Sequence, residues 1–351
     1  MKILHTSDLH LKEDCPERME AAVHILKLAK KESVDLVVIA GDTFDSDVSA
    51  NRLRGRLREM FSGNPFQIMI IPGNHDQLAF QENLEFGDDL EALVGIPFTV
   101  KDLPEVRIVG VPYFEGSTEQ LVLELKNARA ENKTNILVIH CTFDLPSFMQ
   151  EDFGREDKPR YLPFARDVLA ELGSNYILAG HFHSRFIKNP LTENCTFIYP
   201  GSPASVTRRE QGKRSVNILD TEEGPRQVEL NTFYYQTIRV VFNPFEEQKN
   251  LQLLEKDINS HLTENAQLEV VLDGFISSSE KDFRKNIDTI TQGVEKVQRR
   301  YREVSDVLED GLFKKFQVLL EKQQLEEQKK QKIMNTVIRV FSDLKAGERQ
   351  T

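Results

Sequence analysis

The feature that most restricts the fold of this chain is a series of short apolar runs, rich in Ile and Val, in its first 220 residues. The runs lie at 2–7, 35–40, 66–71, 106–110, 135–140, 176–180, 196–200 and 215–219. Both alternate positions of each run are apolar, which predicts strands that are buried on both faces. Amphipathic stretches such as 17–32 separate the runs, and strands that alternate with helices indicate an α/β architecture.

Polar side chains follow five of these runs, at the residue where each predicted strand ends. They are Asp8 and His10, Asp42, Asn74 and His75, His140, and His181 and His183. Ligand sites of α/β sheets form at the carboxyl ends of strands, and several such ends in one sheet can converge on one point. Because Asp8 and His10 are two residues apart, both would point the same way in an extended segment, and the same holds for His181 and His183.

These residue types are metal ligands. Carboxylate, imidazole and amide groups suit Mn, Fe, Zn or similar divalent ions, and no cysteine is needed. A single histidine is more often an ordinary core or surface residue, and we assign that role to His5, His24 and His261. Five of the eight histidines, however, fall within the motifs, together with two Asp residues and one Asn. The pattern therefore predicts a metal site.

The bulk properties add three expectations. A length of 351 residues indicates more than one average domain. The chain starts MKILHTSDLH, without the apolar core of a signal peptide, has no apolar run that could span a membrane, and has three widely spaced cysteines, so we expect a cytoplasmic protein with neither disulfides nor membrane contact. The net charge of −11 neither favours nor excludes a nucleic-acid substrate, because bound cations or local basic clusters can attract phosphates.

The remainder of the chain has a different pattern. Residues 221–227 read as a turn, followed by a strand at 232–242, a helix at 245–261 and a strand at 268–272. From about residue 280 onward we expect helices, because Gly and Pro are scarce and charges are frequent. The last of them, 328–345, carries one apolar stripe that packs either on the protein itself or on a partner.

The motifs TSDLH, GD, GNHD and GHFH, with the isolated His140, resemble the calcineurin-like metallophosphoesterase superfamily. The phrases AGDTFD and YPGSPASVTRRE narrow the resemblance to the SbcD-type DNA-repair nuclease family. This resemblance implies an α/β two-sheet sandwich flanked by helices over 1–236, a small α+β capping domain over 237–295 and C-terminal helices over 296–351. It further implies that the C-terminal helices bind an SbcC-type ATPase, and that the chain forms a homodimer.

The resemblance also implies two divalent metal ions, with manganese as the first expectation and iron or zinc as alternatives. One metal would be held by Asp8, His10, Asp42 and His183, and the other by Asp42, Asn74, His140 and His181. Asp42 would then bridge the two ions, which together clamp a phosphodiester and activate a water molecule. His75 would be a catalytic residue that holds no metal, as general acid or phosphate-positioning group. Asp76 either orients a nearby histidine or stabilises the turn.

One position departs from the nuclease pattern. Many nuclease members carry His where this chain has Asp45, whereas protein phosphatases carry Asp there and follow it with Arg-Gly. Here Ser46 and Asp47 follow, so the metal site is unaffected and the substrate contact of position 45 stays open. Candidate phosphate contacts are Arg208 and Arg209 in a basic cluster that also includes Lys213 and Arg214, and the arginines of 52–58.

Taken together, the residues and the resemblance predict a metal-dependent DNA exonuclease or endonuclease subunit. A phosphodiesterase or phosphatase for small nucleotides is one alternative, and a mainly structural subunit that regulates an ATPase is another. The second domain and the C-terminal helices favour the nuclease over the small-substrate enzyme, and the complete ligand set argues against the structural subunit.

Overall fold

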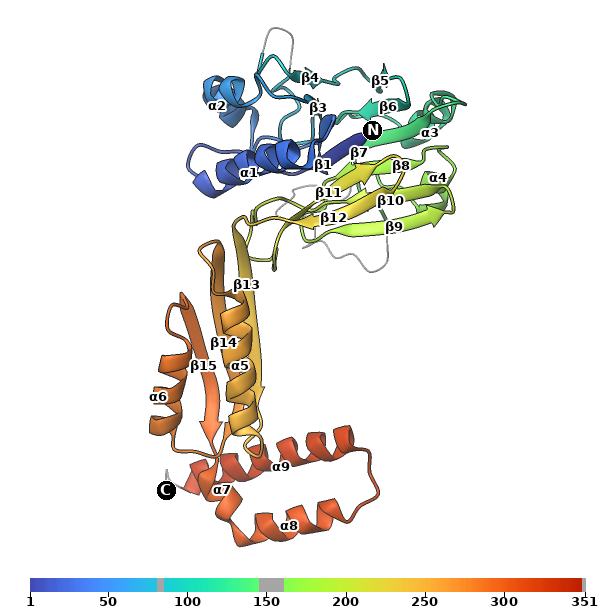
Figure 1. The fold of residues 1–351 in the computed structure, drawn as a ribbon. Coiled ribbons are helices and arrows are strands. Elements are labelled where there is room, and N and C mark those ends of the chain that lie inside the picture. The colour runs from blue at the N-terminus through green and yellow to red at the C-terminus, as the bar shows by residue number, and fades with distance from the viewer. Residues whose placement is uncertain (81–84, 145–160, 349–351) are drawn as a thin grey trace. The chain divides into compact units, whose positions relative to one another are not determined.

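The computed structural model describes residues 1–80, 85–144 and 161–348. The chain divides into two compact units, Met1–Tyr235 and Gln236–Thr351 (Figure 1). The predicted domain boundaries at 236/237 and 295/296 remain predictions, and the last three residues of the predicted C-terminal region lie outside the described residues.

The described residues of the first unit form two six-stranded sheets, and the first of them has the strand order β12-β11-β1-β2-β3-β4. Its strands are β1 (Lys2–Thr6), β2 (Leu36–Ala40), β3 (Gln67–Ile71), β4 (Leu90–Ala92), β11 (Ser215–Asp220) and β12 (Gly224–Glu229). Strands β1 to β4 run parallel, while β11 and β12 complete the sheet in antiparallel register. The parallel strands therefore end at the same edge.

The second sheet has the order β5-β6-β7-β8-β10-β9. Its strands are β5 (Thr99–Asp102), β6 (Val106–Val111), β7 (Thr134–His140), β8 (Tyr176–Gly180), β9 (Ile187–Thr192) and β10 (Cys195–Tyr199). The four central strands are parallel, and the edge strands β5 and β9 are antiparallel to their neighbours.

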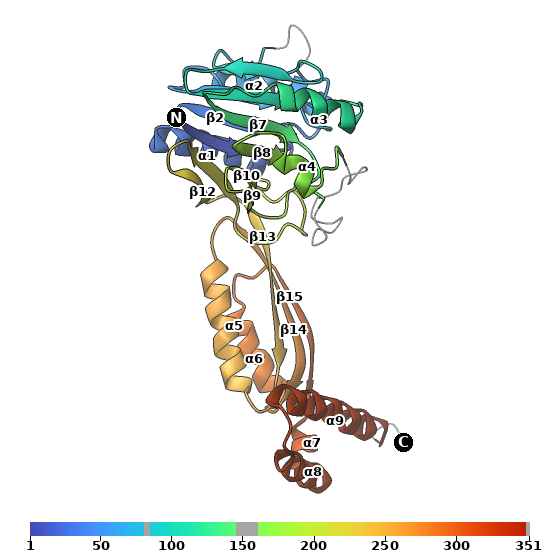
Figure 2. The same ribbon diagram turned by 90° about the vertical axis from the view of Figure 1, so that its right-hand side faces the viewer.

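The two sheets pack face to face, with helices on both outer faces (Figure 2). Apolar residues of both sheets, such as Val38 and Val138, form one core between them. Helices α1 (Pro16–Glu32) and α2 (Asp47–Met60) pack on the outer face of the first sheet. Helices α3 (Thr118–Asn127) and α4 (Arg166–Ala170) pack on the outer face of the second. The predicted α/β two-sheet sandwich is confirmed.

Local sequence signals explain where the first two helices begin and end. Pro16 occupies the first turn of α1, where its missing N–H costs nothing, and Ser33 ends the helix in a left-handed conformation with φ of 53°. Ser46 caps α2, since its Oγ accepts from the backbone N–H of Ser49 at 3.3 Å. These short loops place the residues that follow β1 and β2 directly over the sheet edge.

All eight strands predicted in the first 220 residues are present, but they divide between two sheets, whereas we expected the strand ends to converge within one sheet. The prediction of a turn over 221–227 is wrong in part, because Gly224–Glu229 forms the edge strand β12. The residues of the edge strands β5, β9 and β12 are nearly all partly buried or exposed, so their sequences lack the apolar signal of the central strands.

The second unit contains a three-stranded sheet of order β13-β14-β15 and five helices in the part of the unit that the structure describes. Its elements are β13 (Tyr234–Phe242, which begins at the end of the first unit), α5 (Glu247–His261), β14 (Ala266–Ile276), α6 (Glu280–Ile290), β15 (Lys296–Glu303), α7 (Ser305–Glu309), α8 (Gly311–Glu321) and α9 (Glu327–Glu348). The expectation of helices from residue 280 onward is wrong for β15, which is charged because five of its eight residues are exposed.

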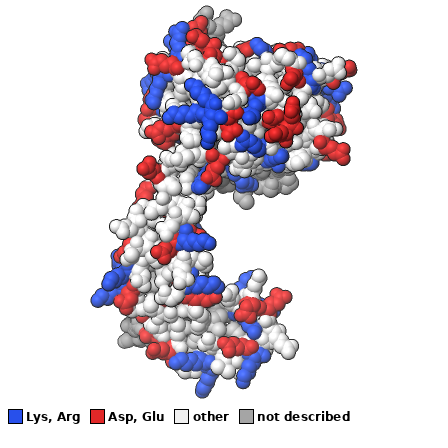
Figure 3. Space-filling model, viewed as in Figure 1, with Lys and Arg blue, Asp and Glu red and all other residues white. Residues whose placement is uncertain are grey.

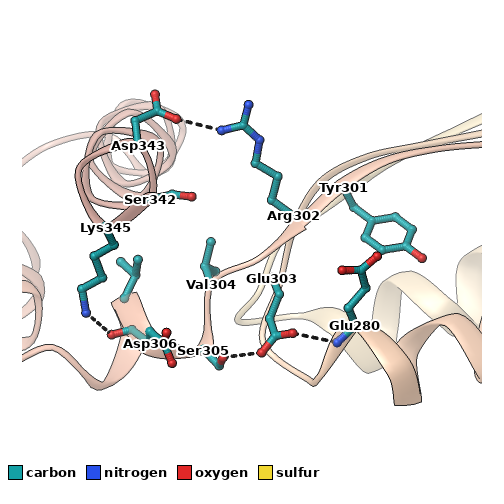
Figure 4. Close-up of a pocket in the computed structure, with 11 residues that line it drawn as sticks. Glu280, Tyr301, Arg302, Glu303, Val304, Ser305, Asp306, Ser342, Asp343 and Lys345 are labelled. Carbon is teal, nitrogen blue, oxygen red and sulfur yellow. Dashed lines mark hydrogen bonds and ion pairs between the residues drawn. The ribbon is translucent and has the colours of Figure 1, made fainter. Parts of the chain in front are cut away.

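The apolar stripe of α9 packs within the second unit. Ile338 is fully buried, and Met334, Val337 and Phe341 pack with it against Val304 and Phe313 among others. Beside this core lies a polar cavity of about 730 Å³, in which Arg302 pairs with Asp343 at 2.7 Å (Figure 4). We expected this stripe to pack either on the protein itself or on a partner, and the structure shows packing on the protein itself.

Among the described residues, no helix is long and apolar enough to cross a membrane. Cys15, Cys141 and Cys195 all carry free thiols.

The packing of the second unit predicts that truncation of one aromatic side chain strongly destabilises it. Phe283 is fully buried, with its ring centroid 4.8 Å from that of Phe242 and 4.7 Å from that of Tyr301. We expect Phe283→Ala to lower the free energy of unfolding of this unit by about 3–5 kcal/mol, because it leaves a cavity. Urea unfolding followed by circular dichroism measures the change. Leu253→Ala on α5, where the side chain is 48% exposed, is the control and should change stability by less than about 0.5 kcal/mol; equal effects would contradict the packing described.

Candidate metal centre

The predicted metal ligands and His75 converge from both sheets. Strands β1, β2 and β3 deliver Asp8, His10, Asp42, Asn74 and His75, while β7 and β8 deliver His140, His181 and His183. Ligand atoms of four of these residues all lie within 4.8 Å of one another, namely Asp8, His10, Asp42 and His183. All four are buried, none more than 2% exposed.

The backbone at this edge is held in conformations that L-residues rarely adopt. The φ angles are 54° at Asp8, 44° at His10, 48° at Asp42 and 93° at His181. The extended geometry assumed for the Asp8/His10 and His181/His183 pairs is therefore wrong. Each such residue costs about 1–3 kcal/mol, and such strain clusters at functional sites. The backbone N–H of Asp8 donates to the carbonyl of Gly41 at 3.1 Å and that of His10 to the carbonyl of Asp42 at 3.0 Å, which locks the two loops together.

Asp42 occupies the centre of the cluster. Its Oδ2 lies 3.2 Å from Nε2 of His140 and 3.9 Å from Nε2 of His10. This oxygen is buried, and among the described residues it has no hydrogen bond. The other oxygen, Oδ1, accepts from the backbone N–H of His75 at 3.0 Å. An ionised oxygen that faces two imidazole nitrogens without a hydrogen bond fits a position between cations.

Ring nitrogens also face other ligand atoms at short range. Nε2 of His10 lies 3.2 Å from Nε2 of His183, and the latter lies 3.5 Å from Oδ1 of Asp8. Nε2 of His140 lies 3.0 Å from Oδ1 of Asn74, while its Nδ1 lies 3.0 Å from the carbonyl oxygen of Ala40. In the neutral ring that second contact would place the hydrogen on Nδ1, which leaves the lone pair of Nε2 available to a cation.

The electrostatics of the cluster agree with this geometry. Burial alone would raise the pKa of Asp42, but His140 and His10 hold it well below the usual range. Burial likewise works against Asp8, and His183 lowers its pKa to about 2. In the opposite sense, burial disfavours protonation of His140, but Asp42 and Asp8 raise its pKa to about 9. Two ionised carboxylates therefore persist without exposure, and they require positive charge beside them.

The donor set therefore fits divalent cations of the Mn, Fe and Zn type: oxygen and imidazole ligands, little exposed and preorganised. His181 completes the set from the second sheet, with its ring centroid 5.1 Å from that of His140 and its backbone N–H donating to Oδ1 of Asp8 at 3.0 Å. The structure thus brings all eight predicted site residues to one place.

His75 lies at the rim of this cluster and is partly exposed. Its Nδ1 lies 3.3 Å from the backbone carbonyl of Asp45, and its ring meets that of His10 edge-on, at 4.9 Å between centroids. We considered two roles for Asp76, orienting a histidine or stabilising the turn, and the structure shows the second. Its carboxylate accepts from the backbone N–H of Gly73 at 2.7 Å and of Phe44 at 3.1 Å.

The carboxylate of Asp45 is engaged by cations. Arg18 donates from Nη1 to Oδ1 of Asp45 at 3.0 Å, and the same Nη1 donates to the carbonyl of His10 at 2.8 Å. Lys12 lies 3.7 Å from the other carboxylate oxygen. Asp45 therefore ties the loop after β2 to the loop after β1 and positions His75 through its backbone.

The basic cluster after the YPGSP turn does not behave as one surface. Arg208 and Arg209 are exposed, and the guanidinium of Arg208 lies 5.1 Å from the ring centroid of Tyr235. Arg214, in contrast, is only 2% exposed and donates to the carbonyls of Ser184 at 3.0 Å and Ser202 at 2.9 Å. The expectation that Arg214 could contact phosphates is therefore wrong.

Sequence reasoning missed one acidic residue. Glu210 is fully buried, and its Oε1 lies 3.5 Å from Nδ1 of His183. Its only signal in the sequence is its place at the end of the YPGSPASVTRRE motif.

A two-sheet sandwich with buried Asp and His side chains at one edge defines a metal-dependent phosphoesterase. The chain belongs to the calcineurin-like phosphoesterase family, which matches residues 1–185. It is accordingly a phosphoester hydrolase by class.

Individual relatives are more distant. The chain is 25% identical to the SbcD subunit of the nuclease SbcCD of Staphylococcus epidermidis over 306 residues, which cover 76% of each protein. It is 24% identical to the uncharacterized metallophosphoesterase YhaO of Bacillus subtilis, over 64% of this chain and 58% of that protein. Among solved structures, the protein TT1561 of Thermus thermophilus superposes with a TM-score of 0.41 at 15% identity, over 65% of this chain and 98% of that one.

The close approach of the two sheets makes one glycine critical. A Cβ on Gly180 would lie 1.9 Å from the carbonyl oxygen of Ala40 and 2.9 Å from Nδ1 of His140. We expect Gly180→Ala to destabilise the first unit by more than about 4 kcal/mol and to abolish metal binding, as measured by thermal unfolding and bound-metal analysis. The matched control is Gly55→Ala on the exposed face of α2, where no atom lies within 4 Å, and which should stabilise by about 0.5–1 kcal/mol. Normal metal binding by the Gly180 variant would show that the sheets are not so closely apposed.

Proposed function

We propose that this chain is a nuclease subunit that hydrolyses phosphodiester bonds of DNA with two divalent metal ions, and that it works with an SbcC-type ATPase in DNA repair and recombination. The observation that carries the proposal is Asp42. One of its carboxylate oxygens lies between ring nitrogens of His10 and His140, which belong to different sheets. A carboxylate in that position can serve two cations at once.

The geometry supports a division of the ligands into two sets. Asp8, His10, Asp42 and His183 would hold one ion, and Asp42, Asn74, His140 and His181 the other. When bound, two such cations, manganese by first expectation, supply Lewis-acid stabilisation of the charge that develops on the phosphate and lower the pKa of water. The chain's own contribution is to hold these ligands buried and oriented before a substrate arrives.

His75 is suited to proton transfer. A backbone carbonyl can only accept, so the contact with Asp45 places the hydrogen of the neutral ring on Nδ1. Nε2 is then the nitrogen that exchanges a proton with the oxygen that leaves the phosphate. Asp45, through its pairing with Arg18, keeps that carbonyl in place, which gives the residue a role in positioning His75.

Similarity to a named nuclease subunit over 76% of the chain favours DNA over a small nucleotide, because the matched length exceeds the first unit alone. On the face drawn in Figure 3, basic and acidic side chains are interspersed. With a net charge of −11, attraction of DNA would depend on the bound cations and on exposed residues such as Arg208 and Arg209. A cytoplasmic location and a homodimer belong to the same proposal.

The partner surface would lie on the helices of the second unit. Since the stripe of α9 is used internally, the residues available to a partner are the exposed ones. Leu312 and Leu319 on α8 are 67% and 61% exposed, and Val340 and Leu344 on α9 are 51% and 62% exposed. Exposed leucines on helices suit docking on a helical partner.

The two-metal assignment predicts that two substitutions both lower activity but differ in their effect on metal binding. We expect His75→Gln to lower the rate of cleavage of linear duplex DNA in Mn²⁺ by about 10²–10⁴-fold while both metals stay bound, because the residue is no ligand. We expect Asp42→Asn to lose bound metal from both sites and activity with it. Cleavage rates and metal content by mass spectrometry measure these outcomes, and loss of metal from the His75 variant would refute its role.

The same assay separates the alternatives. Wild-type protein that hydrolyses bis(p-nitrophenyl) phosphate but never DNA would be a phosphodiesterase for small substrates. Protein that binds two metals and cleaves neither would be a structural subunit.

The proposed partner surface predicts that substitutions on it weaken association with the ATPase without changing catalysis. We expect Leu319→Asp combined with Leu344→Asp to weaken association with the ATPase at least tenfold, because it places charge in an apolar contact. Affinity by calorimetry and cleavage of the small ester by the isolated chain measure the effect. Cleavage should be unchanged, and Lys256→Asp, at an exposed position of α5, gives a control for charge outside this surface. Unchanged affinity of the double variant would place the partner elsewhere.

A further inference from the structure

The segment between β10 and β11 encloses a buried carboxylate behind the metal centre. Glu210 is fully buried, and its two oxygens accept four hydrogen bonds from this segment. The donors are the hydroxyl of Ser202 (2.9 Å), the backbone N–H of Val206 (2.7 Å), and the backbone N–H (3.0 Å) and hydroxyl (3.1 Å) of Thr207. A carboxylate with so many donors is held in one orientation.

In this orientation the carboxylate of Glu210 faces one edge of the His183 ring. Oε1 of Glu210 lies 3.5 Å from Nδ1 of the ring, whereas Nε2 on the opposite side faces His10 and Asp8 at 3.2 Å and 3.5 Å. The two nitrogens of His183 are therefore divided between the buried glutamate and the metal centre. With a cation on Nε2, an imidazole placed in this way would direct its Nδ1 hydrogen toward the carboxylate and keep the lone pair of Nε2 for the cation.

We propose that Glu210 is a positioning residue for His183. Its carboxylate holds the hydrogen of the ring on Nδ1 and fixes the ring angle, so that Nε2 presents its lone pair to the first metal ion. The inference rests on the proposed function, because it assumes that His183 is a ligand. It adds to that function a residue outside the ligand set.

A second residue holds the backbone of His183. Arg214 donates to the carbonyl of His183 through Nη2, and the hydroxyl of Ser202 links the two side chains, accepting from Arg214 at 3.1 Å and donating to Glu210. Arg214 therefore fixes the peptide and Glu210 fixes the ring. Both contacts reach His183 from the segment between β10 and β11, and the contact of Glu210 gives the YPGSPASVTRRE motif a role in the metal centre.

The test uses Glu210→Gln in the full chain, freed of metal and titrated with Mn²⁺ by calorimetry. An amide weakens acceptance from the ring, so we expect affinity to fall by about 10–100-fold at one of the two sites, with the other site unchanged. In the His183→Gln background the same substitution should produce no further loss, because a positioning residue acts through the residue it positions.

The matched control is Glu247→Gln. Glu247, which is 7% exposed in the second unit, accepts from the backbone N–H groups of Ser277 at 2.6 Å and Ser278 at 3.1 Å, so it tests the general effect of neutralising a well-bonded glutamate. It should leave both affinities unchanged. If Glu210→Gln fails to fold, Glu210→Asp keeps the charge and withdraws it from the ring, and the same selective loss is expected.

Three outcomes would overturn the inference: wild-type affinity at both sites in the Glu210 variants, equal loss at both sites, or an additional loss in the His183→Gln background. Failure of the proposed function is distinguishable: if the two-metal assignment is wrong, wild-type protein binds fewer than two Mn²⁺ ions, and if only the nuclease role is wrong, wild-type protein binds two Mn²⁺ ions but cleaves no DNA.

Discussion

The structure depends on two ionised carboxylates, Asp8 and Asp42, that are kept out of water. Both have no exposed surface, and both retain low pKa values because histidines from the opposite sheet surround them. Neither sheet could provide this environment alone, since the carboxylates come from β1 and β2 while His140 and His183 come from the ends of β7 and β8. The ionised state of these two carboxylates therefore depends on the packing of the two sheets.

Bringing the strand ends this close has a conformational cost that the rest of the unit must offset. Four candidate ligand residues adopt positive φ angles, which together amount to about 4–12 kcal/mol of backbone strain. Three apolar cores, one between the sheets and one on each outer face, supply the compensating burial. The strain keeps the side chains aimed at one another before any cation binds, so little reorganisation is needed on binding.

Sequence patterns revealed what depends on local periodicity and residue type. The central strands were predicted because they are apolar on both faces, and the site residues because Asp, Asn and His recur where those strands end. The two-sheet arrangement was expected only from the family resemblance. The assignment of each strand to a sheet, the edge strands and the left-handed backbone at Asp8 and His181 were not predicted, because they depend on contacts between distant segments. In the sequence Arg214 cannot be distinguished from an exposed arginine. Only the carbonyl groups that surround it in the structure reveal that it holds the backbone from a buried position.

Under the proposed function, substrate binding depends on metal occupancy because the metal centre itself is acidic. The buried carboxylates would repel a phosphodiester in the metal-free state, and two divalent cations reverse the sign of the local charge. Groups that set the affinity for the cations then also set the affinity for DNA. Contacts behind the ligands, such as that of Glu210 with His183, would therefore influence substrate binding without approaching the substrate.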